Sequence, residues 1–188
     1  MTTMSLNRRT LLRGCAAAAI TVTAWPMTGV FADTAAPMVS IVPFTATGER
    51  QPAEQVAKVV LTDAEWQAKL SRMSFAVARK AGTERPFSGE LLGEHRKGIF
   101  RCICCDTALF DSQTKFESGT GWPSFYQPIA KENVVEKRDS SLGMERVEVL
   151  CARCDGHLGH VFDDGPRPTG LRYCMNSVSL HFVPAVSA

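Results

Sequence analysis

The spacing of apolar residues predicts helical structure shortly after residue 60. Apolar side chains recur at intervals of three and four residues, at Trp66, Leu70, Met73 and Val77. This period places them on one face of an α-helix, so we expect one helix or two short helices ending near Ala81. Thr62 and Glu65 directly precede this segment and form the capping-box pattern of a helix start.

Beyond residue 85 the helical period gives way to short β-prone runs separated by glycine and proline. The five clearest runs cover residues 98–102, 133–137, 144–150, 170–174 and 177–183. Polar and apolar residues alternate between Glu145 and Leu150, as in a strand with one buried face. The chain is therefore predicted to be mainly β, with antiparallel β-sheets behind short N-terminal helices.

The first 32 residues have the composition of an export signal. Arg8 and Arg9 lie in a charged region, and a modest apolar stretch follows over residues 15–25. This stretch is shorter than the roughly 20 residues that span a bilayer. Val30–Ala32 ends in a small-x-small pattern suited to cleavage. The arginine pair resembles a twin-arginine signal; a general secretory signal and a lipoprotein anchored at Cys15 are the alternatives.

This interpretation divides the chain into three parts. Residues 1–32 are expected to be a signal peptide, residues 33–60 an extension or linker without sustained periodicity, and residues 61–184 the folded domain. Export predicts a periplasmic or otherwise exported protein with no stable membrane association after cleavage. An oxidising compartment favours disulfides, so three disulfides among the six remaining cysteines are one possible arrangement.

Composition and charge exclude one class of partner. The 188 residues are 45% hydrophobic and 21% charged, ordinary values for a globular protein. Residues 1–32 hold three of the 21 basic residues and no acid, so the remaining chain carries 18 basic against 19 acidic residues, a net charge of −1. That balance argues against a nucleic-acid-binding zinc ribbon, because phosphate affinity needs clustered positive charge.

Two Cys-x-x-Cys pairs predict a metal centre. Cys102 and Cys105 form the first pair, and Cys151 and Cys154 form the second. Four thiolates suit one structural Zn²⁺ ion per chain, with no open coordination position. Iron is an alternative metal. The second pair could instead bind a metal together with two nearby histidines, and either pair could have a redox role.

The remaining cysteines are Cys104 and Cys174. Arg172 precedes Cys174 by two residues, so its charge would stabilise a thiolate if both share one strand face. Upstream, His157 and His160 flank a glycine and offer groups that donate a proton near neutrality. Trp122, between glycine and proline, could wall a small apolar pocket. A buried structural cysteine and a folding-anchor tryptophan are the alternatives.

Five motifs together resemble one family. They cover residues 82–89, the two cysteine pairs, and residues 118–125, 156–162 and 171–177. As a set, in this order, they are similar to a B-type methionine-R-sulfoxide reductase over about residues 60–184. The resemblance implies the antiparallel β-fold of that family, and reduction of methionine-R-sulfoxide by an enzyme specific for that epimer.

The resemblance also implies residue roles. Cys174 matches the nucleophile that attacks the sulfoxide sulfur and becomes a sulfenic acid. His157 and His160 match the groups that bind or protonate the sulfoxide oxygen, and Asn176 matches a polar residue of the same site. Trp122 matches the ring that receives the substrate methyl group. The supporting positions are Arg172 and Asp164.

One position departs from the pattern. Many family members carry a resolving cysteine where this chain has Thr120. Cys104 is therefore a candidate resolving residue, and direct reduction by an external thiol is the alternative. The expected partners are oxidised proteins bearing methionine-R-sulfoxide and a thioredoxin-like reductant, with the enzyme acting as a monomer. The competing function is a non-catalytic zinc-bound β-module that binds a ligand or protein in the same cleft.

Overall fold

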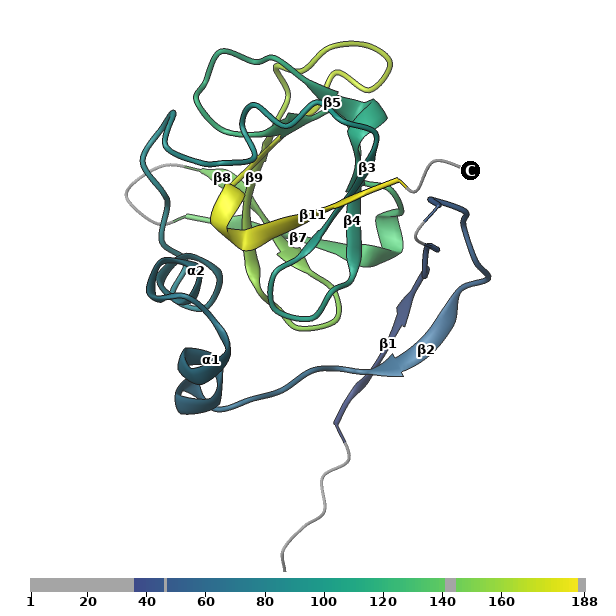
Figure 1. Ribbon diagram of the computed structural model, residues 1–188, viewed down its shortest axis with the longest axis vertical. Helices are drawn as coiled ribbons and strands as arrows, with labels where there is room; N and C mark the ends of the chain where they lie inside the picture. Colours follow the sequence, from purple (N-terminus) through teal and green to yellow (C-terminus); the bar gives the residue numbers. More distant parts are fainter. Residues whose placement is uncertain (1–35, 46, 141–144, 186–188) are drawn as a thin grey trace, which may run out of the picture. The chain divides into compact units, whose positions relative to one another are not determined.

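The computed structural model describes residues 36–45, 47–140 and 145–185. The predicted export signal lies outside these residues. The described chain forms two short α-helices and three antiparallel β-sheets (Figure 1), which confirms the predicted fold class. Among the described helices, none is both long and apolar enough to span a bilayer.

The helical segment is two helices of seven residues each. Helix α1 spans Asp63–Lys69 and α2 spans Arg72–Ala78. The capping box forms as predicted: the Thr62 hydroxyl accepts from the Glu65 amide, and the Glu65 carboxylate accepts from the Thr62 amide. Ser71 caps α2 in a similar way, and this second cap divides the helical period in two. Helix α2 packs against strand β9 (His157–Phe162), beneath the site described below.

The largest sheet has six strands and carries Cys174, Arg172 and both candidate histidines. Its strand order is β5-β6-β10-β9-β8-β7, with every neighbouring pair antiparallel. The remaining strands of this sheet are β5 (Lys115–Phe116), β6 (Ser124–Phe125), β7 (Val134–Asp139), β8 (Arg146–Cys151) and β10 (Arg172–Met175).

A three-stranded sheet covers one face of the larger one. Its order is β11-β3-β4, and its strands are β3 (Gly98–Cys102), β4 (Ala108–Asp111) and β11 (Leu180–Pro184). Phe110 of β4 stacks on Phe125 of β6 with ring centroids 4.4 Å apart, and Phe100 of β3 meets the same ring edge-on at 4.9 Å. These contacts between the sheets form the core. Short 3₁₀ helices connect the strands at η1 (Ser112–Thr114), η2 (Lys131–Asn133) and η4 (Ser177–Ser179).

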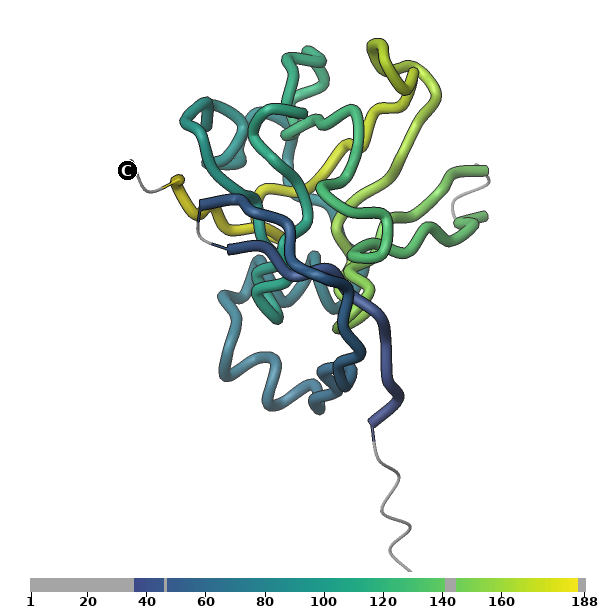
Figure 2. Tube along the Cα trace, turned by 90° about the vertical axis from the view of Figure 1, so that its right-hand side faces the viewer, coloured from purple at the N-terminus to yellow at the C-terminus, as the bar shows by residue number. Residues whose placement is uncertain are grey.

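The segment expected to be an extension or linker contains a β-hairpin. Strands β1 (Met38–Ile41) and β2 (Glu54–Ala57) pair with each other, and Figure 2 shows this hairpin facing the viewer as the purple segment. The buried Asn133 amide fixes it, since Oδ1 accepts from the Val42 amide at 2.7 Å and Nδ2 donates to the Val42 carbonyl at 2.8 Å. The strands escaped prediction because each has only four residues, too few to show a clear hydrophobic alternation.

All five predicted strand regions contain a strand, but the strand over residues 157–162 was not among the predicted ones. Residues 157–162 have the composition of a glycine-containing loop, whereas they form strand β9 at the centre of the six-stranded sheet. Gly159 is the reason. A Cβ at this position would lie 2.1 Å from the carbonyl oxygen of Cys174, so only glycine allows β10 to approach so closely.

Candidate active site and metal centre

Four chemically active residues form one row across the six-stranded sheet. Cys174 on β10 lies directly opposite His160 on β9 and opposite Ser124 on β6. His160 in turn lies opposite Glu148 on β8. Directly opposed residues in antiparallel strands project from the same face, with Cβ atoms about 5 Å apart. The register therefore brings the predicted nucleophile and a predicted proton donor together.

A small pocket opens beside this row. It has a volume of about 140 Å³, and its lining includes Cys174, His160, Trp122, Asn176 and Phe162. Cys174 is half-buried and forms part of the pocket lining. The pocket wall is predominantly apolar, which suits a thioether better than a charged group.

His160 has an acidic partner that sequence analysis missed. Its Nε2 atom lies 2.9 Å from Oδ2 of Asp139 at the end of β7. Arg146 also donates to Asp139 Oδ2, at 2.7 Å. When Nε2 donates to Asp139, Nδ1 of His160 is the ring nitrogen left for another partner.

His157 is more deeply buried and lies behind His160. The two rings meet edge to face with centroids 5.4 Å apart. Nδ1 of His157 lies 2.7 Å from Glu148 Oε1, and Nε2 is buried without a hydrogen-bond partner among the described residues. Burial lowers the pKa of His157, although the hydrogen bond to Glu148 opposes this shift. His157 does not line the pocket around Cys174, and it contacts the site through the ring of His160.

Arg172 and Asp164 form the predicted supporting pair. Arg172 Nε and Nη2 each donate to one carboxylate oxygen of Asp164 at 2.8 Å, a bidentate arrangement. The guanidinium lies 4.4 Å above the Phe162 ring. Its pKa is raised, first because Asp164 accepts its hydrogen bonds and also through electrostatic interaction with Cys174, although burial opposes the shift. Arg172 therefore supplies fixed positive charge on the strand that carries Cys174.

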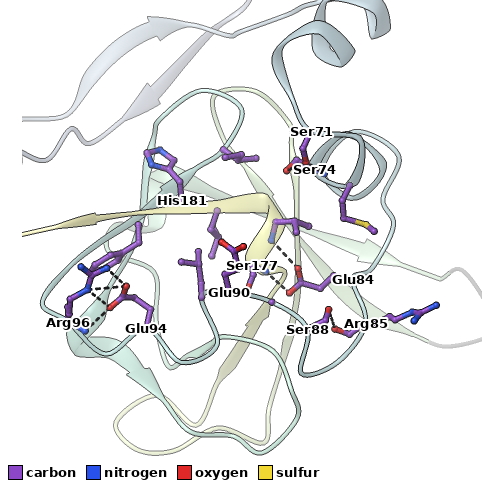
Figure 3. Close-up of a pocket in the computed structure, with 17 residues that line it drawn as sticks. Ser71, Ser74, Glu84, Arg85, Ser88, Glu90, Glu94, Arg96, Ser177 and His181 are labelled. Atoms are coloured by element: carbon purple, nitrogen blue, oxygen red, sulfur yellow. Dashed lines mark hydrogen bonds and ion pairs between the residues drawn. The ribbon is translucent and has the colours of Figure 1, made fainter.

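Glu84 holds two walls of the pocket in place, and sequence analysis did not assign it a role. Its carbonyl oxygen accepts from Trp122 Nε1 at 3.1 Å, and its amide donates to Asn176 Oδ1 at 3.0 Å. Its buried carboxylate accepts from the amides of Ser177 at 2.7 Å and Val178 at 3.0 Å. Figure 3 shows Glu84 beside Ser177 among the residues that line a larger cavity.

The larger cavity in Figure 3 lacks a comparable set of reactive groups. Its volume is about 950 Å³, and its lining includes neither Cys174 nor the candidate histidines His157 and His160. Glu94 and Arg96 in its wall pair with each other. Chemistry therefore identifies the smaller pocket as the candidate active site, although the other cavity is larger.

Asn176 is fixed by its own hydrogen bonds. Besides accepting from Glu84, its amide donates to the Leu158 carbonyl through Nδ2 at 3.0 Å. The residue is only 3% exposed, so it ties the end of β10 to β9 and to the residue that orients Trp122.

Thr120, the residue in place of a resolving cysteine, contacts Cys174, the predicted nucleophile. Its Oγ1 atom lies 3.7 Å from Cys174 Sγ. The geometry thus places this position beside the reactive sulfur, while the residue itself offers a hydroxyl and no thiol.

The two cysteine pairs converge in a four-sulfur cluster. The sulfur atoms of Cys102, Cys105, Cys151 and Cys154 all lie within 4.8 Å of one another. Cys102 Sγ is 3.6 Å from Cys154 Sγ, and Cys105 Sγ is 3.5 Å from Cys151 Sγ. A tetrahedral zinc ion with bonds of about 2.3 Å requires sulfur separations of about 3.8 Å. The cluster therefore has the donors and the dimensions of a metal site.

The loops that carry these sulfurs are built alike. Asp106 and Asp155, which follow the second cysteine of each pair, both adopt positive φ angles, 62° and 54°. Their amides donate to the carbonyls of Cys102 and Cys151, each at 2.9 Å. Each pair thus forms a tight knuckle at a strand end, which turns both of its sulfurs toward the same point.

Cys104 lies at this cluster rather than in the pocket. It is buried and lies between the cluster residues Cys102 and Cys105 in the chain. It is not among the residues that line the pocket around Cys174. Its predicted part in recycling Cys174 stays a prediction.

Most residues missed by sequence analysis are acids that hold other site residues. Glu148, Asp139 and Glu84 contact His157, His160 and the Trp122–Asn176 pair respectively. Glu148 lies in the alternating segment 145–150, so the sequence indicates which face of the strand it occupies. Its histidine partner could not be predicted, because that contact depends on the strand register.

Comparisons with known proteins agree with this geometry. The SelR domain matches residues 70–184. The chain is 58% identical over 127 residues to the peptide methionine sulfoxide reductase MsrB of Pseudomonas entomophila (strain L48), covering 68% of this chain and 97% of the relative. It is 59% identical over 127 residues to the protein of the same name from Pseudomonas putida (strain W619), covering 68% of this chain and 96% of the relative. The matched domain and these relatives show that the chain belongs to the SelR family, the B-type methionine-R-sulfoxide reductases.

Proposed function

We propose that this chain reduces methionine-R-sulfoxide in oxidised proteins, with Cys174 as the nucleophile. Membership of the family supports the overall reaction, the reduction of methionine-R-sulfoxide to methionine. The observation that assigns it to this pocket is the cross-strand row that sets Cys174 beside His160. A free amino acid and a protein-bound side chain present the same sulfoxide group.

In the proposed first step the thiolate of Cys174 attacks the sulfoxide sulfur. One proton is taken up by the sulfoxide oxygen, because that oxygen is a poor leaving group unless it is protonated. The oxygen passes to Cys174 as a sulfenic acid, and the substrate leaves as the thioether, reduced by two electrons. His160 is the proton donor in this scheme, with Asp139 holding its Nε2 side.

The other site residues act through position and charge. Arg172 favours the thiolate, and Asp164 holds Arg172 in place. Trp122 forms the wall that receives the substrate methyl group, in the orientation set by its hydrogen bond to Glu84. His157 supports His160 through their ring contact.

Recycling needs a thiol from outside the pocket. A thioredoxin-like donor would condense with the sulfenic acid, forming a mixed disulfide and releasing water, and a second thiol would then free Cys174. In the alternative route Cys104 resolves the sulfenic acid as an intramolecular disulfide. Because Cys104 is buried against the metal cluster, that route requires the first knuckle to open.

The metal is proposed to be one structural Zn²⁺ per chain. Four thiolates leave no coordination position for substrate, so the ion would hold the two knuckles together and take no part in the reaction. The proposal is supported by the four sulfur donors and their spacing.

The protein is further proposed to be exported and to act as a monomer. Residues 1–32 would act as a twin-arginine signal. They would direct residues 33–60 and the reductase domain, residues 61–184, to the periplasm in a folded state. Fusing residues 1–32 to a reporter in strains with and without the twin-arginine translocase tests this, and export in both strains would refute it.

Turnover of separate R- and S-sulfoxide substrates with dithiothreitol tests the function. We expect reduction of the R epimer alone, with Cys174→Ser abolishing turnover while metal content stays unchanged. Activity retained in that variant would refute the assignment of the nucleophile. Binding of a sulfoxide peptide without any turnover would favour the non-catalytic module instead.

A further inference from the structure

A chain of three hydroxyl groups ends on the reactive sulfur. Thr120 Oγ1 lies 3.7 Å from Cys174 Sγ and 2.8 Å from Ser118 Oγ. Ser118 Oγ lies 2.7 Å from Ser124 Oγ, and Ser124 Oγ lies 3.2 Å from the Trp122 carbonyl oxygen. Ser124 is 1% exposed and directly opposite Cys174 in the sheet, so this chain of hydroxyl groups runs along the buried side of the nucleophile.

The number of hydroxyl hydrogens limits the directions in which these groups can donate hydrogen bonds. Each hydroxyl carries one hydrogen and so donates one hydrogen bond. With Cys174 as a thiol, the S–H group can donate to Thr120, Thr120 to Ser118, Ser118 to Ser124, and Ser124 to the Trp122 carbonyl. In this direction every hydrogen is used and points away from the sulfur.

Ionisation of the thiol allows the opposite direction. The thiolate is an acceptor only, so Thr120 rotates its hydroxyl to donate to the sulfur, Ser118 then donates to Thr120, and Ser124 donates to Ser118. No heavy atom moves, and the proton from the thiol leaves to solvent. The only hydrogen bond given up is the 3.2 Å contact to the Trp122 carbonyl.

We propose that Thr120, Ser118 and Ser124 form a reversible hydrogen-bond chain that stabilises the thiolate of Cys174. The proposal rests on the nucleophilic role of Cys174 given above. Thr120 contacts the reacting atom and acts as a catalytic residue, whereas Ser118 and Ser124 position its hydroxyl. A bond to a charged acceptor is stronger than a bond between neutral groups, so reversal favours the ionised form.

Alkylation of Cys174 by iodoacetamide across a pH series tests the chain. The rate is followed by mass spectrometry of the peptide that contains Cys174, in the full-length, metal-bound protein. Thr120→Val keeps the side-chain shape and removes the hydroxyl, so the profile should move to higher pH, with a rate near neutrality about tenfold lower. Thr120→Ser keeps the hydroxyl and should restore the wild-type profile, and Ser118→Ala should give a smaller displacement in the same direction.

The controls make the result specific. Thr47→Val, on the exposed hairpin turn, should leave the profile unchanged. A wild-type profile for Thr120→Val, or an equal displacement for Thr120→Ser, would overturn the proposal. If Thr120→Val does not fold, Ser118→Ala decides, and a wild-type profile there would overturn it. Alkylation needs no sulfoxide, so an inactive enzyme with the expected displacements would refute the proposed function while leaving the hydroxyl chain intact.

Discussion

Replacement of Glu84 by glutamine should damage both stability and substrate binding. Glu84 is 4% exposed in the fold as a whole, and its two carboxylate oxygens accept from two separate backbone amides. Glutamine offers one oxygen and one NH₂ group, and NH₂ cannot accept a hydrogen bond. One of the amides of Ser177 and Val178 would therefore be left without its partner in Glu84→Gln.

The size of the effect follows from the burial of these groups. A buried donor without an acceptor costs about 1–3 kcal/mol, so we expect the free energy of unfolding to fall by about 2 kcal/mol. Glu84→Ala removes both acceptors and should cost roughly twice as much. Because the Glu84 backbone also contacts Trp122 and Asn176, its displacement should raise KM for the sulfoxide more than it lowers kcat.

Urea unfolding and steady-state kinetics measure the two effects. Glu90→Gln is the matched control, since Glu90 is exposed in the wall of the same large cavity (Figure 3) and should change unfolding by less than about 0.5 kcal/mol. Equal unfolding free energies for Glu84→Gln and wild type would refute the reasoning. So would a fall in kcat with unchanged KM, because the effect would then lie in chemistry rather than in the pocket walls.

Three further predictions concern the metal, a histidine and recycling. Cys151→Ser should lose zinc, as measured by elemental analysis, and unfold, because the metal contributes folding free energy; a folded, metal-free variant would contradict this. The pKa of His157 is lowered by burial, so below about pH 6.5 the unfolded chain takes up a proton that the folded chain refuses, and the free energy of unfolding should fall as pH falls. His157→Gln should reduce this pH dependence, and an unchanged slope in urea unfolding would count against it. If Cys104 resolves the sulfenic acid, one turnover without reductant should give a Cys104–Cys174 disulfide by mass spectrometry; a persistent sulfenic acid without that link would exclude this route.

Local patterns predicted the elements whose signals lie within a few residues. The capping box at Thr62, the period through Trp66 and the two cysteine knuckles are short-range features, and the structure contains each of them. The β-hairpin over residues 38–57 was missed, because long-range bonds from Asn133 hold it.

The candidate site shows the same division. Residue types and motifs alone identified Cys174, both histidines, Trp122 and the four metal cysteines. The acids that hold these residues were not identified, because Glu148 and Asp139 reach the histidines only through the pairing of β7, β8 and β9.

The sequence by itself determined the family and the presence of threonine in place of a resolving cysteine, and it predicted Cys174 as the nucleophile and four cysteines as metal ligands, since each is a matter of residue identity and local spacing. Tertiary structure alone decided which groups face Cys174. Strand register set His160 and Ser124 on either side of the sulfur, and the loop before β6 brought the Thr120 hydroxyl to 3.7 Å from it. The physical reason is that a one-residue slip in any of these strands would turn the same side chains to the other face of the sheet.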